Sequence, residues 1–265
     1  MSVPSLELVN SVIGTELEPI VYAYTERDVA LYALGIGAPA DWLDQSELRY
    51  VYELSGEGFK VIPSFAVIYT GGMIQKILQG NVGGIEFNPM MLVHGEQSIE
   101  VKRPLPTSGT ITSVPKITNI FDKGSGLLMV THTTSMDENG DVVAVGQSSM
   151  FIRGLGGFGG ERGTSEKVEI PDREPDVVHE ESTLQIQALI YRLSGDVNPL
   201  HADPQMAAIG NFETPILHGL STFGFATRAV MKHFCDNDSD KLTAVGVRFS
   251  KHVFPGDTLV TEMWK

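Results

Sequence analysis

The chain has 265 residues, with 33 acidic side chains against 19 Lys and Arg, a net charge of −14 at pH 7 and a single cysteine, Cys235. This acidity argues against nucleic-acid binding, because backbone phosphates are held by dense Lys and Arg surfaces. One cysteine cannot form an internal disulfide, no apolar run approaches the roughly 18 residues of a membrane span, and residues 1–14 lack the pattern of a secretory signal. We therefore expect a soluble, intracellular protein with no membrane or nucleic-acid partner.

The first half predicts a helix followed by antiparallel strands. Residues 25–34 have helical character, whereas residues 110–118, 126–135 and 141–152 combine β-branched residues with a rough alternation of apolar and polar positions. Residues 137–140, with the sequence DENG, have the composition of a hairpin turn.

A segment rich in Gly and charge, residues 153–176, follows these strands and predicts a linker. Its residues 154–159 match G-x-G-x-x-G, which binds a dinucleotide only where a helix opens at the last glycine. The following residues include Pro171 and Pro175 and do not predict that helix. We interpret the glycines as part of the linker.

The second half predicts helices at residues 184–193 and 221–234 and a strand at 242–250. One face of the longer helix carries four residues at helical spacing, which predicts a stripe buried against a sheet. The four residues are Phe223, Thr227, Val230 and Phe234.

The two halves show a faint internal repeat. Three pairs of segments recur in the same order: residues 32–35 with 191–195, His94-Gly95 with His218-Gly219, and residues 102–111 with 251–259. We predict two related units, 1–152 and 177–265, each an α+β unit in which a helix packs on an antiparallel sheet. The second copy stops at Lys265, early in its strand from Thr258, and would leave open sheet edges. We therefore expect the second unit to be truncated and the 265 residues to be a fragment.

The strongest chemical signal is a carboxylate and an imidazole five residues apart. Asp196 and His201 lie on either side of a Pro-containing turn and can hold a water between them. Either group could take or deliver a proton, and the His pKa suits that role near neutral pH. The alternative is a purely structural turn, which we prefer for Asp203-Pro204 as the start of a helix.

Gly219 lies at the start of the long predicted helix. Its amide has no partner within the helix and carries the positive end of the helix dipole, so it is a candidate oxyanion donor. We interpret His218 as a core or turn histidine. His201, Asp203 and His218 could be imagined as metal ligands, but without an H-E-x-x-H or paired-Cys pattern we predict no metal.

Residues 191–201, YRLSGDVNPLH, and 215–220, PILHGL, resemble the hydratase 2 motif of R-specific 2-enoyl-CoA hydratases in the MaoC-like dehydratase group. The likeness extends through residues 94–97, 123–126 and 248–251 and is closest to the hydratase domain of peroxisomal multifunctional enzymes type 2. The resemblance implies two hotdog folds in tandem, with antiparallel sheets wrapped around a long helix of the C-terminal half. That half carries catalysis, and the N-terminal half makes room for the acyl chain.

The implied reaction is the reversible hydration of trans-2-enoyl-CoA to (3R)-3-hydroxyacyl-CoA in fatty acid β-oxidation. By this resemblance Asp196 and His201 activate the water, Asn198 helps to position it, and the Gly219 amide binds the thioester oxygen. The resemblance also implies no cofactor beyond the CoA of the substrate, a homodimer, and a peroxisomal location, with the cytoplasm as the alternative.

Further residues are implied as substrate contacts. Cations are needed because CoA is a polyanion and the chain is acidic. Lys123 is the first candidate, followed by Arg248 and Lys251, and the alternative for Lys251 is a solvated surface charge. Matching motif positions add His94, Gly95, Val197, Pro199, Leu200 and Phe249.

Two other functions stay open on the sequence. One is a dehydratase that acts on acyl-carrier-protein thioesters or small branched acyl-CoA thioesters. The other is a catalytically inactive module that binds acyl-CoA.

Overall fold

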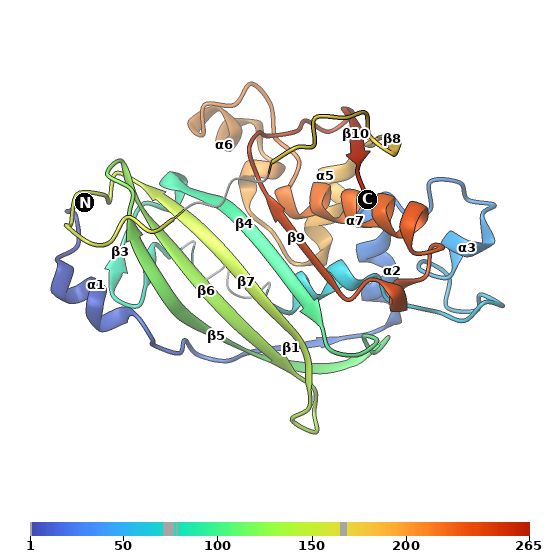
Figure 1. Cartoon of the computed structure of the whole chain (residues 1–265), viewed down its shortest axis with the longest axis horizontal. Coiled ribbons are helices and arrows are strands. Elements are labelled where there is room, and N and C mark those ends of the chain that lie inside the picture. Colours follow the sequence, from blue (N-terminus) through green and yellow to red (C-terminus); the bar gives the residue numbers. More distant parts are fainter. Residues whose placement is uncertain (1, 71–76, 78, 165–168) are drawn as a thin grey trace.

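The structure, a computed structural model, describes residues 2–70, 77, 79–164 and 169–265. Its largest element is an antiparallel six-stranded sheet with the strand order β1-β5-β6-β7-β4-β9 (Figure 1). The strands are β1 Ile20–Tyr24, β4 Leu92–Val101, β5 Gly109–Asp122, β6 Gly126–Met136, β7 Val142–Arg153 and β9 Ala244–Arg248. Because β9 pairs with β4, the two halves of the chain share one sheet.

The three long predicted strands are confirmed as β5, β6 and β7, and the predicted strand at 242–250 is confirmed as the shorter β9. The predicted hairpin turn joins β6 to β7. The Asp137 side chain accepts hydrogen bonds there from the amides of Asn139 and Asp141, and Gly140 adopts a φ of 84°. Two small sheets complete the strands: β2 Asn81–Val82 with β3 Ile85–Glu86, and β8 Val177–Ser182 with β10 Thr258–Met263.

The longest helix in the described part of the chain is α7, and the other helices are shorter. The α-helices are α1 Leu6–Val12, α2 Glu26–Gly35, α3 Gln45–Leu48, α5 Gln187–Tyr191, α6 Pro204–Ile209 and α7 Gly219–Phe234, and the 3₁₀ helices are η1 Pro63–Thr70, η2 Pro89–Met91, η3 Arg192–Ser194, η4 Pro199–His201 and η5 Ser239–Lys241. In the described part of the chain, none of the helices has the length and apolar character of a membrane span. The predicted helix 184–193 is wrong at its start, because α5 begins only at Gln187. The Gln187 side chain accepts a hydrogen bond from the Leu184 amide, which lies before the helix.

The main core lies where α2, η1 and α7 pack against the sheet, and it includes Phe223 of α7 and Ile111 of β5. The predicted buried stripe of α7 is confirmed at Phe223 and Thr227. It is wrong at Phe234, which is 37% exposed. Phe234 is the last residue of the helix, and the next residue, Cys235, is buried instead.

Two of the three repeated segment pairs stay predictions, and in both cases the structure brings the two halves into contact. Tyr32 at α2 and Tyr191 at α5 pack together with ring centroids 6.0 Å apart, and β4 pairs with β9 just before the last repeated segments. The His-Gly pair is wrong as a repeat. His94 lies on strand β4, whereas His218 precedes helix α7, so the two dipeptides do not occupy equivalent positions.

Side chains of the second half hold the end of α2. The Gln187 amide group donates to the carbonyls of Leu34 and Gly35, and the Ser221 hydroxyl donates to Gly35 at 3.0 Å. Carbonyls at a helix C-terminus lack partners within the helix, and the bonds from Gln187 and Ser221 satisfy the Gly35 carbonyl. They fix α5 and α7 against α2.

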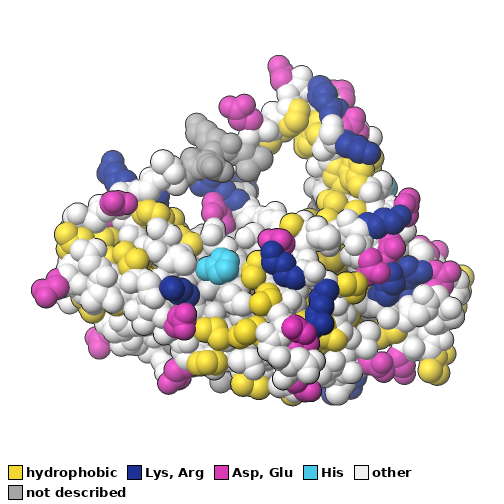
Figure 2. Space-filling model, turned by 60° about the horizontal axis from the view of Figure 1, so that its bottom comes forward, with side chains coloured by type: hydrophobic (Ala, Val, Ile, Leu, Met, Phe, Trp, Pro, Cys, Tyr) yellow, Lys and Arg dark blue, Asp and Glu magenta, His cyan; other side chains and the backbone are white. Residues whose placement is uncertain are grey.

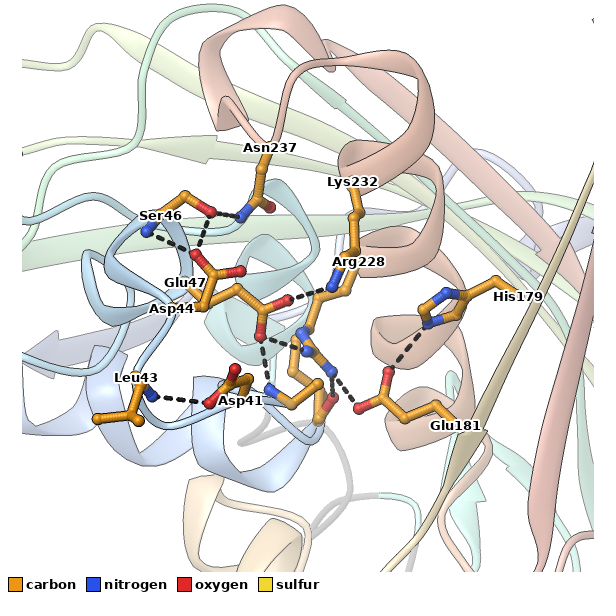
Figure 3. Close-up of polar contacts among 12 residues, drawn as sticks. Asp41, Leu43, Asp44, Ser46, Glu47, His179, Glu181, Arg228, Lys232 and Asn237 are labelled. Atoms are coloured by element: carbon orange, nitrogen blue, oxygen red, sulfur yellow. Dashed lines mark hydrogen bonds and ion pairs between the residues drawn. The ribbon is translucent and has the colours of Figure 1, made fainter.

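A buried ionic cluster extends this contact (Figure 3). Arg228 of α7 donates to the carbonyl of Ile36 at 3.0 Å, to Glu181 of β8 at 2.8 Å and to Glu47 of α3 at 3.0 Å. Lys232, one turn further along α7, lies 3.4 Å from Glu47. The cluster therefore joins α7 to both halves of the chain.

The glycine-rich residues 154–159 bind a carboxylate of the chain itself. The Asp122 side chain accepts from the amide of Gly157 at 2.8 Å, of Gly159 at 2.9 Å and of Gly124 at 2.8 Å. These backbone bonds lower the pKa of Asp122. No helix begins in the described residues 160–164, which agrees with the rejection of a dinucleotide site. The domain limits 1–152, 153–176 and 177–265 stay predictions.

Candidate active site

The turn that carries Asp196 is fixed by its own side chains. Gly195 adopts a φ of 123°, a conformation that favours glycine, and so lets the chain turn between η3 and Asp196. The Asp196 carboxylate accepts from the Asn198 amide at 3.1 Å, and the Asn198 side chain accepts from the Leu200 amide at 3.0 Å. Asn198 thereby caps η4, which ends at His201, and its NH₂ group stays available as a donor.

His201 is 9% exposed and has a defined tautomer. Its Nδ1 lies 2.8 Å from the Ile216 carbonyl, which can only accept, so Nδ1 carries the proton and Nε2 presents a lone pair. Burial lowers the pKa of His201, although Asp196 and the Ile216 bond act in the opposite direction. The imidazole is therefore neutral at pH 7 and suited to accept a proton.

His218 lies against His201. The two rings are stacked with centroids 3.7 Å apart and an interplanar angle of 27°, and the Nε2–H of His218 donates to the Asp196 carbonyl at 3.1 Å. One ligand-type atom from each of Asp196, His201 and His218 lies within 4.8 Å of the others. These three groups could hold a metal ion by distance, and the absence of a metal stays a prediction.

Gly219 begins helix α7, as predicted, with His218 as its N-cap. Among the described residues, no backbone carbonyl accepts from the Gly219 amide. A Cβ at this position would lie 3.2 Å from the Phe249 ring, so glycine allows the ring to lie against the helix start. The amide is therefore a suitable donor for a developing oxyanion.

His94 and Gly95 lie on strand β4, next to this site. The register of β4 against β7 shifts between His94 and Glu96, a bulge that redirects the strand. The His94 ring lies 5.1 Å from the Phe249 ring, and the Phe249 amide donates to the Gly95 carbonyl at 2.9 Å. Burial lowers the pKa of His94. The structure thus brings His94, Gly95, Phe249 and Gly219 together.

A cavity of about 130 Å³ runs from Asp196 along the sheet. Most of its lining residues had no sequence signal, except that Tyr191 and Ser194 belong to the hydratase 2 motif. The lining residues are Ala66, Val67, Ile68, Ile77, His94, Gln97, Ile99, Thr131, Thr133, Ser135, Ala144, Val145, Gly146, Gln147, Ser148, Met150, Tyr191, Ser194, Asp196 and Leu220. An elongated apolar group can therefore extend from Asp196 into the N-terminal half.

The candidate CoA cations lie on two separate segments, the loop between β5 and β6 and the end of β9. Lys123 is half-buried on the loop between β5 and β6, 5.4 Å from the centre of the Phe121 ring. Arg248 lies 3.5 Å from Glu96, and Lys251 is exposed after β9. On the face drawn in Figure 2, Lys and Arg side chains lie singly or beside acidic side chains. The CoA contacts stay predictions.

The comparisons with known proteins define the family. Residues 22–154 match the MFE-2 hydratase 2 N-terminal domain, and residues 166–265 match the MaoC like domain. The chain therefore belongs to the MaoC-like dehydratase family, whose members are hydro-lyases. Within that family its N-terminal half is of the hydratase 2 type, as the motif predicted.

Individual relatives agree with this assignment. A probable enoyl-CoA hydratase 2 from Dictyostelium discoideum is 48% identical over 97% of this chain and 87% of its own length. A MaoC-like dehydratase structure from Phytophthora capsici superimposes with a TM-score of 0.83 at 39% identity, over 97% of this chain and 88% of that one. Peroxisomal multifunctional enzyme type 2 from Drosophila melanogaster gives a TM-score of 0.79 at 40% identity, over 93% of this chain and 43% of the longer one.

The predicted fold class, α+β with two hotdog folds in tandem, is confirmed. The fold is shared with a Mycobacterium tuberculosis protein described as having a double hotdog fold, at a TM-score of 0.62 and 11% identity over 94% of this chain and 82% of that one. At that identity the likeness concerns the fold alone.

We expect the free energy of unfolding to decrease as the pH falls below about 6.5, the ordinary pKa of His. Burial lowers the pKa of His94, His201 and His218 in the folded protein. Between their folded and unfolded pKa values the unfolded chain binds more protons, so acid favours unfolding. Thermal unfolding midpoints between pH 7.5 and pH 5 test this, in a range above the pKa of most carboxylates. A constant midpoint across that range would contradict it.

Proposed function

We propose that the protein catalyses the reversible hydration of trans-2-enoyl-CoA thioesters to (3R)-3-hydroxyacyl-CoA thioesters. The observation that carries this proposal is the Asp196 carboxylate on the cavity wall, with the neutral imidazole of His201 close to it and the helix-start amide of Gly219 directly after His218. The enoyl-CoA hydratase 2 relative supports the choice of substrate. The (3R) configuration follows from the hydratase 2 resemblance.

Asp196 and His201 activate the water in this proposal. Nε2 of His201 presents a lone pair because Nδ1 is bound to Ile216, and the Asp196 carboxylate offers a second acceptor beside it. The water oxygen bonds to C3 while one of its protons moves to this pair. General acid–base catalysis of this kind contributes about 10²- to 10⁴-fold. The NH₂ group of Asn198 helps to hold the water.

The Gly219 amide stabilises the charge that this addition creates. As the C3–O bond forms, the electron pair of the C2=C3 bond moves towards the thioester and its oxygen becomes negative. An amide at the start of the 16-residue helix α7 donates to that oxygen without reorganisation. The proton taken by Asp196 and His201 then passes to C2, which completes the addition of one water. No cofactor enters this scheme.

The substrate lies along His94, Gly95 and Phe249 in this proposal. The acyl chain enters the cavity between β4, β6 and β7, with Val197, Pro199 and Leu200 on the catalytic turn beside the thioester. The name of one relative favours a peroxisomal location, and the hydratase 2 resemblance favours a role in fatty acid β-oxidation and a homodimer.

The direct test is turnover of trans-2-enoyl-CoA of several chain lengths, followed by the loss of the conjugated enoyl thioester. We expect product that is oxidised by a (3R)-specific and not by a (3S)-specific dehydrogenase. The same acyl groups on acyl-carrier protein provide the competing substrate. Saturable binding of acyl-CoA without any turnover would support an inactive binding module and contradict the proposal.

Replacing Lys123 with alanine is expected to raise the KM for enoyl-CoA about twofold to fivefold and to leave kcat unchanged, because a partly exposed ion pair contributes about 1 kcal/mol or less. An enoyl-pantetheine substrate, which lacks the nucleotide phosphates, is expected to show no change. Lys241→Ala is the control, since Lys241 lies beyond the opposite end of α7 and pairs with Asp236. An equal effect on both substrates would remove Lys123 from the CoA site.

A further inference from the structure

His218 has contacts that a merely space-filling histidine does not need. It is 1% exposed, its ring stacks on His201, and its Nε2–H donates to the main-chain carbonyl of Asp196. The next residue in the chain is Gly219, the first residue of α7. One side chain therefore touches both members of the proposed acid–base pair and is covalently joined to the proposed oxyanion donor.

We propose that His218 is a positioning residue that fixes the positions of the Asp196 turn and the His201 ring relative to the Gly219 amide. This inference rests on the proposed function, because it assigns His218 to the same reaction. His218 does not exchange protons with the substrate. It acts through the Asp196 turn, to which it donates a hydrogen bond, through the His201 ring, on which it stacks, and through Gly219, which follows it in the chain.

The side-chain bonds that fix the turn at Asp196 span only two residues, so they do not fix its position relative to α7. Gly195 is exposed, Val197 is 44% exposed, and Asp196 is only half-buried. The hydrogen bond from His218 comes from a residue 22 positions away and ties this surface turn to the buried start of α7. Without it the carboxylate can move relative to Nε2 of His201, and a displacement of about 1 Å can cost about 100-fold in rate.

The stack also requires His218 to stay uncharged. Burial lowers the pKa of His218 well below its usual range, and the neighbouring His201 acts in the same direction. His201 can then accept a proton without facing a second cation at a ring distance of 3.7 Å. Within the described residues, Nδ1 of His218 has no hydrogen-bond partner, so its loss removes no further bond.

Two substitutions separate the hydrogen bond from the packing. His218→Phe keeps a flat ring against His201 and removes the donor, whereas His218→Gln places an amide N–H where Nε2 lies. We expect His218→Phe to lower kcat for enoyl-CoA about 10- to 100-fold with KM within about twofold of the wild type. We expect His218→Gln to retain most of the kcat. His218→Met is the second variant without a donor, for use if the phenylalanine does not fold.

Hydrogen exchange supplies a readout that does not depend on activity. Peptides that cover residues 192–201 are expected to exchange faster in His218→Phe and at the wild-type rate in His218→Gln, because the turn that holds the Asn198 amide on Asp196 is released. Wild-type kcat or unchanged exchange in the variants without a donor would overturn the inference. A wild-type protein that hydrates no enoyl thioester would refute the proposed function, while the exchange comparison would still test the contact of His218 with the turn.

Discussion

Asp196→Asn and His201→Gln are each expected to lower kcat for trans-2-enoyl-CoA about 10²- to 10⁴-fold, which is the usual contribution of general acid–base catalysis. Asparagine keeps the oxygen that can accept from the Asn198 amide but loses the negative charge. Glutamine at position 201 removes the imidazole whose Nε2 lone pair receives the proton. Initial rates with saturating substrate measure both effects.

The unfolding midpoint separates loss of chemistry from loss of fold. Asp196 is half-buried, so we expect Asp196→Asn to unfold close to the wild-type temperature. Asp203→Asn is the matched control, because Asp203 caps α6 in the same segment and has no place in the proposed chemistry. If both catalytic variants turn over at the wild-type rate, the proposed mechanism is wrong. If Asp203→Asn loses as much activity as Asp196→Asn, the effect belongs to the segment and not to the carboxylate.

Local sequence patterns predicted the parts of the fold that depend on neighbouring residues. The strands β5, β6 and β7 follow from alternation and β-branched residues, and the start of α7 at Gly219 follows from the turn before it. Asp196 and His201 could be paired from sequence because both lie within one short turn, whose internal hydrogen bonds span two residues.

Contacts between distant segments could not be predicted in this way. The carboxylate that binds Gly157 and Gly159 lies 35 and 37 positions earlier, at Asp122, so the glycine-rich segment, interpreted as linker, gave no sign of this contact. The repeat of His94-Gly95 with His218-Gly219 failed because a dipeptide does not report whether it lies in a strand or at a helix start. The bulge at Gly95 likewise depends on pairing with β7.

The ionic cluster around Arg228 is the clearest case, since Glu47 and Arg228 are 181 positions apart. Periodicity predicted an apolar stripe on α7 and gave no indication of a buried charge beside it. A fully buried arginine persists only where carboxylates and carbonyls satisfy it, and those partners come from α3, β8 and the end of α2. The fold of both halves must be known before this residue can be interpreted.

Arg228→Met is expected to destabilise the protein by about 3–5 kcal/mol, the usual cost of removing one partner from a buried ion pair. Arg228 is 7% exposed, and its loss removes the buried cation shared by Glu47 and Glu181 and leaves Glu47 with the partly exposed Lys232 alone. The Ile36 carbonyl also loses its donor. Urea unfolding measures the change as a lower midpoint at similar slope.

Lys232→Met is the matched control, because Lys232 lies one turn along the same helix and approaches the same Glu47. Its side chain is 40% exposed, so we expect a loss of about 1 kcal/mol or less. Glu47→Gln and Glu181→Gln together in the Arg228→Met background should restore part of the stability, because they remove the uncompensated charges. Equal, small effects of Arg228→Met and Lys232→Met would show that the cluster is solvated, and that the packing of α7 against α2 is maintained by its apolar contacts and the Gln187 and Ser221 bonds alone.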